Sequence, residues 1–132
     1  MPKRVNPAIS EAESQVMELL WRGAPRGSEE LVAALQPDTA WHENTVRTLL
    51  NRLVRKGAVC AEREGRRYLY SPVLTREQWQ SHESRSLLDR VFGGKVAPLL
   101  VHFSRNEKLS AKDVAELRKL VDQLEKKGRR HD

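Results

Sequence analysis

The sequence predicts a mainly α-helical protein with one small β-hairpin. Three observations lead to this class. Aromatic residues make up only 5% of the 132 residues, and charged residues make up 32%. Apolar residues recur at helical spacing in several segments, and two short strand-like runs lie between the third and fourth of these. The chain is long enough to bury a core, as one domain or as a small domain with an appendage.

Two helices are predicted before residue 40. Ser10 and Glu13 form a capping box, in which each side chain accepts a hydrogen bond from the other residue's backbone amide. The helix that follows is expected to end near Trp21, because glycine and proline come next. Ser28 can cap a second, shorter helix that ends at Gln36.

The third predicted helix, from about residue 44 to 56, has the clearest pattern in the chain. Its apolar residues fall at i, i+3, i+4, i+7 and i+8, which makes one continuous stripe. The stripe consists of Val46, Leu49, Leu50, Leu53 and Val54. The opposite face and its flanks contain amides, hydroxyls and guanidiniums but no carboxylate. These residues are Asn44, Thr45, Arg47, Thr48, Asn51, Arg52 and Arg55.

A hairpin is predicted after Gly57, which stops the third helix. Residues 58–63 and 66–70 are strand-like, a tight turn is expected at Glu64 and Gly65, and Pro72 closes the second strand. Three helices followed by a hairpin are the element order of a winged helix-turn-helix. We therefore expect residues 1–75 to form a winged-helix domain.

Residues 76–132 are predicted to form a helical dimerisation region with a basic tail. Thr75 begins a second capping box, and its helix extends to about Phe92, before a Gly-Gly pair. A short apolar helix begins near Pro98. Ser110 caps the last helix, which extends to about residue 127, and residues 126–132 form the tail.

The apolar residues of this region predict a homodimer, because one further helix of the same chain cannot cover them all. The candidate dimer contacts are Leu88, Val91, Phe92, Leu99, Leu100, Phe103, Val114, Leu117, Val121 and Leu124. The last four alternate by three and four, as in paired helices. The alternative is that the stripe packs on the chain's own winged helix.

Positive charge begins abruptly at the third helix. Residues 1–43 carry four basic and seven acidic side chains, whereas residues 44–75 carry seven basic and two acidic ones. The net charge is +6, and the pI near 9.8 favours a polyanionic partner. A solvated helix face beside a basic turn would be the simpler interpretation, but two neighbouring elements share the charge. We therefore expect residues 1–75 to bind double-stranded DNA.

The polar residues divide by position along the helix and hairpin, since a recognition helix presents its N-terminal half to the bases. Base readout is assigned to Asn44, Thr45, Arg47 and Thr48. Phosphate contact is assigned to Asn51, Arg52, Arg55 and Lys56. The hairpin adds Arg63, Arg66 and Arg67, placed along the DNA backbone or in the minor groove.

Other classes of protein fit poorly. The sequence has no Gly-rich phosphate loop and no nucleophile elbow, so no enzyme activity or cofactor is expected. The four histidines lie on separate elements without metal-ligand spacing, and we expect no metal. Cys60, the only cysteine, excludes an internal disulfide. No apolar run approaches the ~18 residues of a membrane span, and no secretory signal is evident, so a cytoplasmic protein without membrane insertion is expected.

Three ordered segments resemble the penicillinase-repressor family of the BlaI/MecI/CopY type. They read I-S-x-x-E-x-x-V-M-x-x-L-W at residues 9–21, T-V-R-T-L-L-N-R-L-x-x-K-G at residues 45–57 and G-R-x-Y-x-Y-S-P at residues 65–72. Trp41 also matches, and the resemblance covers residues 9–127. It implies a winged-helix transcriptional repressor that binds palindromic operators as a homodimer, paired through residues 76–127. Control of antibiotic resistance is the family's best-known output.

The resemblance also implies two signalling routes that differ between branches. In the resistance branch a membrane sensor-protease signals, and that protease or another one cuts the repressor. By position the cut maps to His102 and Phe103, where resistance-type relatives carry Asn before the Phe. The copper-responsive branch carries Cys-x-Cys pairs, which this chain lacks. The residues alone leave two other functions open: regulation by a small ligand bound between the C-terminal helices, and a winged helix used only for protein contacts.

Overall fold

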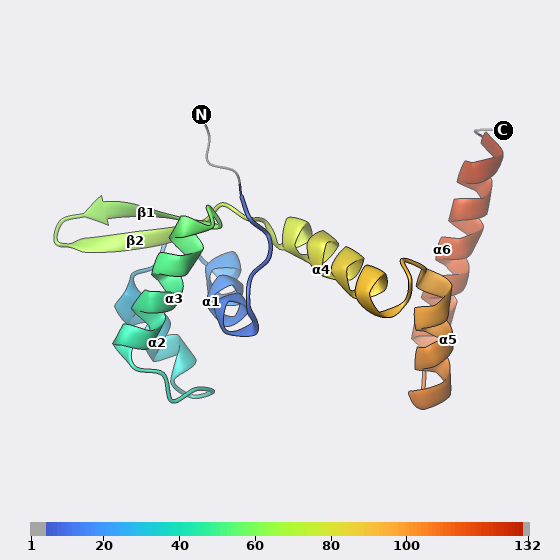
Figure 1. The fold of residues 1–132 in the computed structure, drawn as a ribbon, viewed down its shortest axis with the longest axis horizontal. Coiled ribbons are helices and arrows are strands. Elements are labelled where there is room, and N and C mark those ends of the chain that lie inside the picture. The colour runs from blue at the N-terminus through green and yellow to red at the C-terminus, as the bar shows by residue number, and fades with distance from the viewer. Residues whose placement is uncertain (1–4, 131–132) are drawn as a thin grey trace. The chain divides into compact units, whose positions relative to one another are not determined.

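Six helices and one hairpin follow one another along residues 5–130, which are the residues that this computed structural model describes (Figure 1). The elements are α1 (Glu11–Arg22), α2 (Ser28–Leu35), α3 (Glu43–Arg55), β1 (Val59–Glu64), β2 (Arg67–Pro72), α4 (Arg76–Val91), α5 (Val96–Asn106) and α6 (Ala111–Arg130). The predicted mainly α-helical class with one hairpin is confirmed.

The contacts divide the chain into two compact units, one ending at Ser86 and one beginning at Leu87. This division falls inside α4. The functional boundary expected between residues 75 and 76 stays a prediction, because a division by contacts does not show where a function begins. None of the helices in the described part of the chain is long and apolar enough to cross a membrane.

Side-chain caps begin three of the helices where the sequence predicted them. The Glu13 amide donates to Ser10 Oγ at 3.1 Å and the Ser10 amide donates to Glu13 Oε1 at 2.8 Å, which completes the first capping box. Thr75 makes the corresponding pair of bonds at α4, and Ser110 accepts from a backbone amide at α6. The prediction for Ser28 was wrong, because Gly27 is the N-cap of α2 and no side chain caps that helix.

The core of the first unit lies where α1, α2 and α3 meet beside the start of the hairpin. The apolar stripe of α3 is buried as predicted, except that Val54 is only partly buried. Figure 1 shows α3 beside α1 and α2, in agreement with the contacts between them. Burial of this stripe turns the polar face of α3 away from the core, and so the hydrophobic pattern positions the candidate site.

The hairpin turn lies one residue later than predicted. Glu64 pairs with Arg67, so Gly65 and Arg66 form the turn, and Gly65 has a φ of +63°, which favours glycine. Arg66 was therefore wrongly placed in the second strand. The α1–α2 loop also joins this sheet, because the backbones of Arg26 and Tyr70 exchange hydrogen bonds of 3.1 and 2.8 Å.

The second unit consists of the end of α4 together with α5 and α6. Gly93 and Gly94 both have positive φ, and the Gly94 amide donates to the Leu88 carbonyl at 2.7 Å, which ends α4 as predicted. α6 continues to Arg130, so most of the expected tail is helical instead. The rest of that tail, including His131, lies outside the described residues.

Candidate nucleic-acid interface

The polar face of α3 is open to solvent along its whole length. All seven residues assigned to it from the sequence are exposed: Asn44, Thr45, Arg47, Thr48, Asn51, Arg52 and Arg55. The Thr48 hydroxyl donates to the Asn44 carbonyl at 2.9 Å, which leaves its lone pairs free to accept from a base amino group. This face offers donors and acceptors of the kind that read base edges.

One carboxylate borders this face. α3 begins at Glu43, a residue earlier than predicted, and Glu43 Oε1 lies 2.7 Å from Arg47 Nη2. The predicted helix began at about residue 44 and so left out this carboxylate, which the observed helix includes. The i, i+4 spacing of the two residues was the sequence signal for this pair. The Arg47 side chain remains 58% exposed, so the pair holds the guanidinium at the surface without burying it.

Lys56 is bound within the fold. Its Nζ donates to Glu13 Oε1 at 2.6 Å and to the Ala8 carbonyl at 2.9 Å. These bonds tie the C-terminal end of α3 to the first turn of α1. We therefore leave Lys56 out of the proposed interface, although the sequence assigned it to phosphate contact. No short-range pattern links residues 13 and 56, so this bond could not be predicted from the sequence.

Glu13 explains why Lys56 is held in this way. Its side chain is 2% exposed, and burial of a carboxylate raises its pKa. The hydrogen bonds from Lys56 and Ser10 outweigh that effect and leave the pKa of Glu13 below its usual value. The carboxylate thus stays charged in the folded protein, with Lys56 as its counter-ion.

The three hairpin arginines are all exposed, but they differ in their partners. Arg67 Nη1 lies 3.0 Å from Glu30 Oε1, and so connects β2 to α2. Arg63 Nε donates to the Gly65 carbonyl at 3.1 Å. Within residues 5–130 the guanidinium of Arg66 has no such partner. The turn therefore presents Arg66 as its most available cation.

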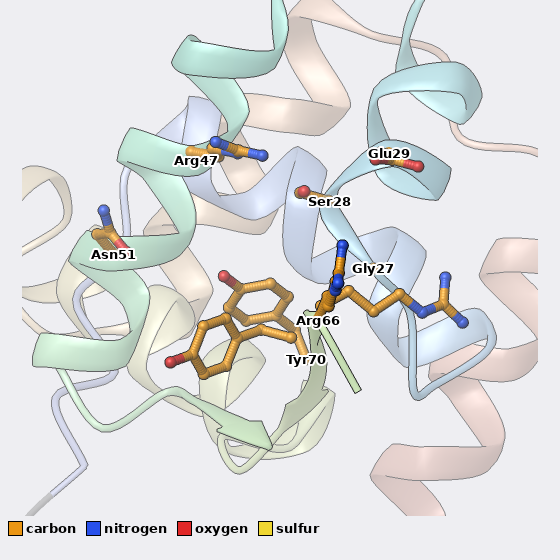
Figure 2. Close-up of a pocket in the computed structure, with 9 residues that line it drawn as sticks. Gly27, Ser28, Glu29, Arg47, Asn51, Arg66 and Tyr70 are labelled. Atoms are coloured by element: carbon orange, nitrogen blue, oxygen red, sulfur yellow. The ribbon is translucent and has the colours of Figure 1, made fainter. Parts of the chain in front are cut away.

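A polar hollow of about 370 Å³ joins the helix to the hairpin. Figure 2 shows Arg47 and Asn51 of α3, Ser28 and Glu29 of α2, and Arg66 and Tyr70 of the hairpin around it. The structure thus brings polar residues of α3 and of the hairpin to one surface. Its hydroxyls, amide and guanidiniums suit a polyanionic ligand with polar edges, and Glu29 is the one carboxylate among the described residues that line it. Among the described residues no group of three metal-ligating side chains occurs.

The predicted dimer contacts divide by exposure. Leu88 is buried, and Phe92, Leu99 and Leu117 are partly buried. The other six are exposed in the single chain: Val91, Leu100, Phe103, Val114, Val121 and Leu124. His102 and Phe103 lie inside α5, and the His102 ring is 6.2 Å from that of Phe92.

Comparison with known proteins identifies one family whose model matches most of the chain. The model of the penicillinase repressor family matches residues 9–123. The penicillinase repressor of Bacillus licheniformis is 30% identical over 89% of this chain and 91% of its own length. That of Staphylococcus aureus is 29% identical over 90% of this chain and 94% of its own. The DNA-binding domain of the repressor BlaI superposes with a TM-score of 0.52 and 32% identity, covering 57% of this chain and 92% of that domain.

The matched region includes α1, α2, α3, the hairpin, α4, α5 and most of α6. The family is one of transcriptional repressors and not of enzymes. α3 and the hairpin, which form the polar surface described above, both lie inside the matched region. The chain therefore belongs to the penicillinase repressor family.

Proposed function

We propose that this protein is a sequence-specific transcriptional repressor that binds a palindromic operator as a homodimer. The main support is the continuous polar surface formed by α3 and the hairpin turn, on which all seven predicted polar residues of α3 are exposed. A helix enters the major groove most readily with such a face toward the bases. A repressor of this kind works where the chromosome is, which in a bacterium is the cytoplasm.

The roles follow from position and from the partners of each side chain. Asn44, Thr45, Arg47 and Thr48 read base edges, because they lie on the N-terminal half of α3. Asn51, Arg52 and Arg55 contact phosphates, together with Arg63, Arg66 and Arg67 of the wing. Arg66, at the turn and without a side-chain partner in the described chain, makes the strongest of the wing contacts.

The homodimer is supported by the apolar side chains of α5 and α6. Phe103, Val121 and Leu124 are 44, 50 and 57% exposed in the single chain, and a second copy would remove this apolar surface from water. Two linked recognition helices can then occupy successive major grooves ~34 Å apart. Linkage raises affinity for a palindrome without new base contacts.

Derepression occurs by proteolysis near His102 and Phe103, through a membrane sensor-protease or another protease. The two residues lie in the middle of α5, within the apolar region assigned to dimerisation. A cut there would separate α6 from the DNA-binding unit. The dimer would weaken, and each half would hold its half-site with much lower affinity.

The deciding experiment is selection from random duplexes with the full chain at near-physiological salt, while its oligomeric state is measured by sedimentation. We expect an enriched palindrome bound by a dimer. Arg47→Ala should relax base preference at one operator position, costing ~1–3 kcal/mol there. Weak binding without enrichment that disappears as salt rises would contradict the proposal.

A further inference from the structure

We propose that Trp21, Arg76 and Trp79 form a joint that fixes the first turns of α4 on the winged helix, and that this joint sets the half-site separation the dimer accepts. The inference rests on the proposed function, because it concerns how two DNA-binding units are held for one operator. The three residues are positioning residues. They act through α4 and not by touching DNA.

Trp21, in the last turn of α1, holds the residues just before α4. Its Nε1 donates to the Leu74 carbonyl at 2.8 Å. Leu74 is buried, and its amide and that of Val73 donate to the Ala58 carbonyl at 3.0 and 2.8 Å. The chain entering α4 is therefore attached both to α1 and to the start of the hairpin. This leaves little freedom for a hinge at residues 73 and 74.

The first turn of α4 adds contacts to the same indole. The Arg76 guanidinium carbon lies 5.5 Å from the Trp21 ring centroid, and Arg76 Nη2 is 2.8 Å from Glu18 Oε2 on α1. The Trp79 ring is 5.5 Å from that of Trp21, at an interplanar angle of 37°. Residues 76 and 79 are three apart, so one face of α4 makes both contacts. Cation–π and tilted aromatic pairs of this kind are attractive.

The joint makes residues 76–86 of α4 an extension of the DNA-binding unit, which ends at Ser86. The 16 residues of α4 span about 24 Å at 1.5 Å per residue. A tilt of about 10° at its base would move its far end by roughly 4 Å, more than the ~3.4 Å of one base-pair step. Holding the base of α4 therefore removes one source of variation in half-site separation that is as large as a base-pair step.

The first test uses no DNA. Amide hydrogen exchange is compared in the full chain for the wild type, Trp79→Ala and Trp79→Phe. Trp79 Nε1 is buried without a hydrogen-bond partner in the described chain, so Phe keeps the ring contact and loses no bond. In Trp79→Ala we expect amide exchange over residues 77–86 to accelerate roughly tenfold, while exchange in α3 is unchanged. In Trp79→Phe we expect exchange over residues 77–86 to resemble that of the wild type. Unchanged exchange in α4, or equal acceleration in α3, would overturn the joint.

The second test uses the palindrome selected by the wild type, the same duplex with one or two base pairs inserted between half-sites, and a single half-site. Trp79→Ala should bind the single half-site within about twofold of wild type, while its preference for the native spacing falls roughly tenfold. Trp79→Phe should retain that preference. Retention by Trp79→Ala would overturn the spacing role. If the wild type selects no palindrome, the proposed function fails and the spacing role with it, while hydrogen exchange still decides whether the joint exists.

Discussion

The two units of the chain use similar apolar patterns in different ways. Among the described residues, every buried apolar side chain except Leu88 belongs to the unit that ends at Ser86. Ten of the twelve large apolar side chains that are exposed belong to the other unit. Both units show helices with one apolar face. The apolar pattern of a helix therefore predicts which of its faces is to be buried. Only the fold shows whether other residues of the same chain cover that face.

The largest effect expected on either side of this comparison comes from the core of the first unit. Leu20 is 1% exposed, and Leu20→Ala should lower the free energy of unfolding by about 3 kcal/mol through lost burial and a cavity. Leu120, 48% exposed in α6, is the matched control. Urea denaturation with the chain diluted below its dimer dissociation constant measures both. Equal losses would show that the second unit has its own core after all.

The second prediction concerns the exposed apolar face of α6. Leu124→Asp places a charge where the proposed partner packs, and should raise the dimer dissociation constant on the order of 100-fold. Gln123→Asp adds the same charge beside it on the helix and should change the constant little. Analytical ultracentrifugation measures both. Single half-site binding should be unaffected, and identical behaviour of the two variants would exclude this face from the interface.

The third prediction concerns the charged pair inside the first unit. Lys56→Met leaves the Glu13 carboxylate buried without its counter-ion, and should cost roughly 2 kcal/mol at pH 7, below the range for fully buried pairs because Lys56 is partly exposed. The lowered pKa of Glu13 makes its stabilising contribution complete above about pH 4.3, the usual carboxyl value, and lost as pH falls through the folded-state pKa.

The difference between wild type and Lys56→Met should therefore shrink as the pH falls through the lowered pKa of Glu13, because Glu13 then becomes protonated in both proteins. Lys119→Met, on the exposed surface of α6, serves as the control and should show no such trend. Thermal unfolding followed at several pH values measures the difference. If the difference in stability between the two proteins were the same at pH 3 and pH 7, the loss in Lys56→Met would not depend on the charge of Glu13.

The smallest effect expected is at the wing. Arg66→Ala should lower the slope of log affinity against log salt by ~1, on specific and random DNA alike. Arg67→Ala should lower it less, because Glu30 already neutralises part of that charge. Arg118→Ala on α6 controls for net charge. Fluorescence anisotropy across a salt series gives the slopes, and an unchanged slope for Arg66→Ala would remove this residue from the phosphates.

Periodicity predicted the order of elements because local patterns determine it. The caps at Ser10, Thr75 and Ser110 and the stripe of α3 all depend on residues a few positions apart. The errors occurred where one residue changes a boundary. α3 begins at Glu43, one residue earlier than predicted, and Arg66 lies in the turn instead of the predicted strand.

Contacts between distant residues were outside the reach of such patterns. The bonds of Lys56 to Glu13, of Arg67 to Glu30 and of Trp21 to Leu74 each join segments far apart in the chain. Neither propensity nor charge distinguishes a lysine that meets a carboxylate in the fold from one that meets phosphate. For the candidate site, composition indicated the surface, and the fold decided which cations are available on it.

The bond between Glu13 and Lys56 has a consequence for exchanging recognition helices between relatives. Residue 56 follows the last residue of α3, so a graft of the helix with its C-cap replaces the partner of a carboxylate that remains behind in α1. A donor with an apolar residue there would bring its operator preference and destabilise its new host at once. Chimeric repressors built on this scaffold should therefore keep Lys56, or exchange residue 13 together with the helix.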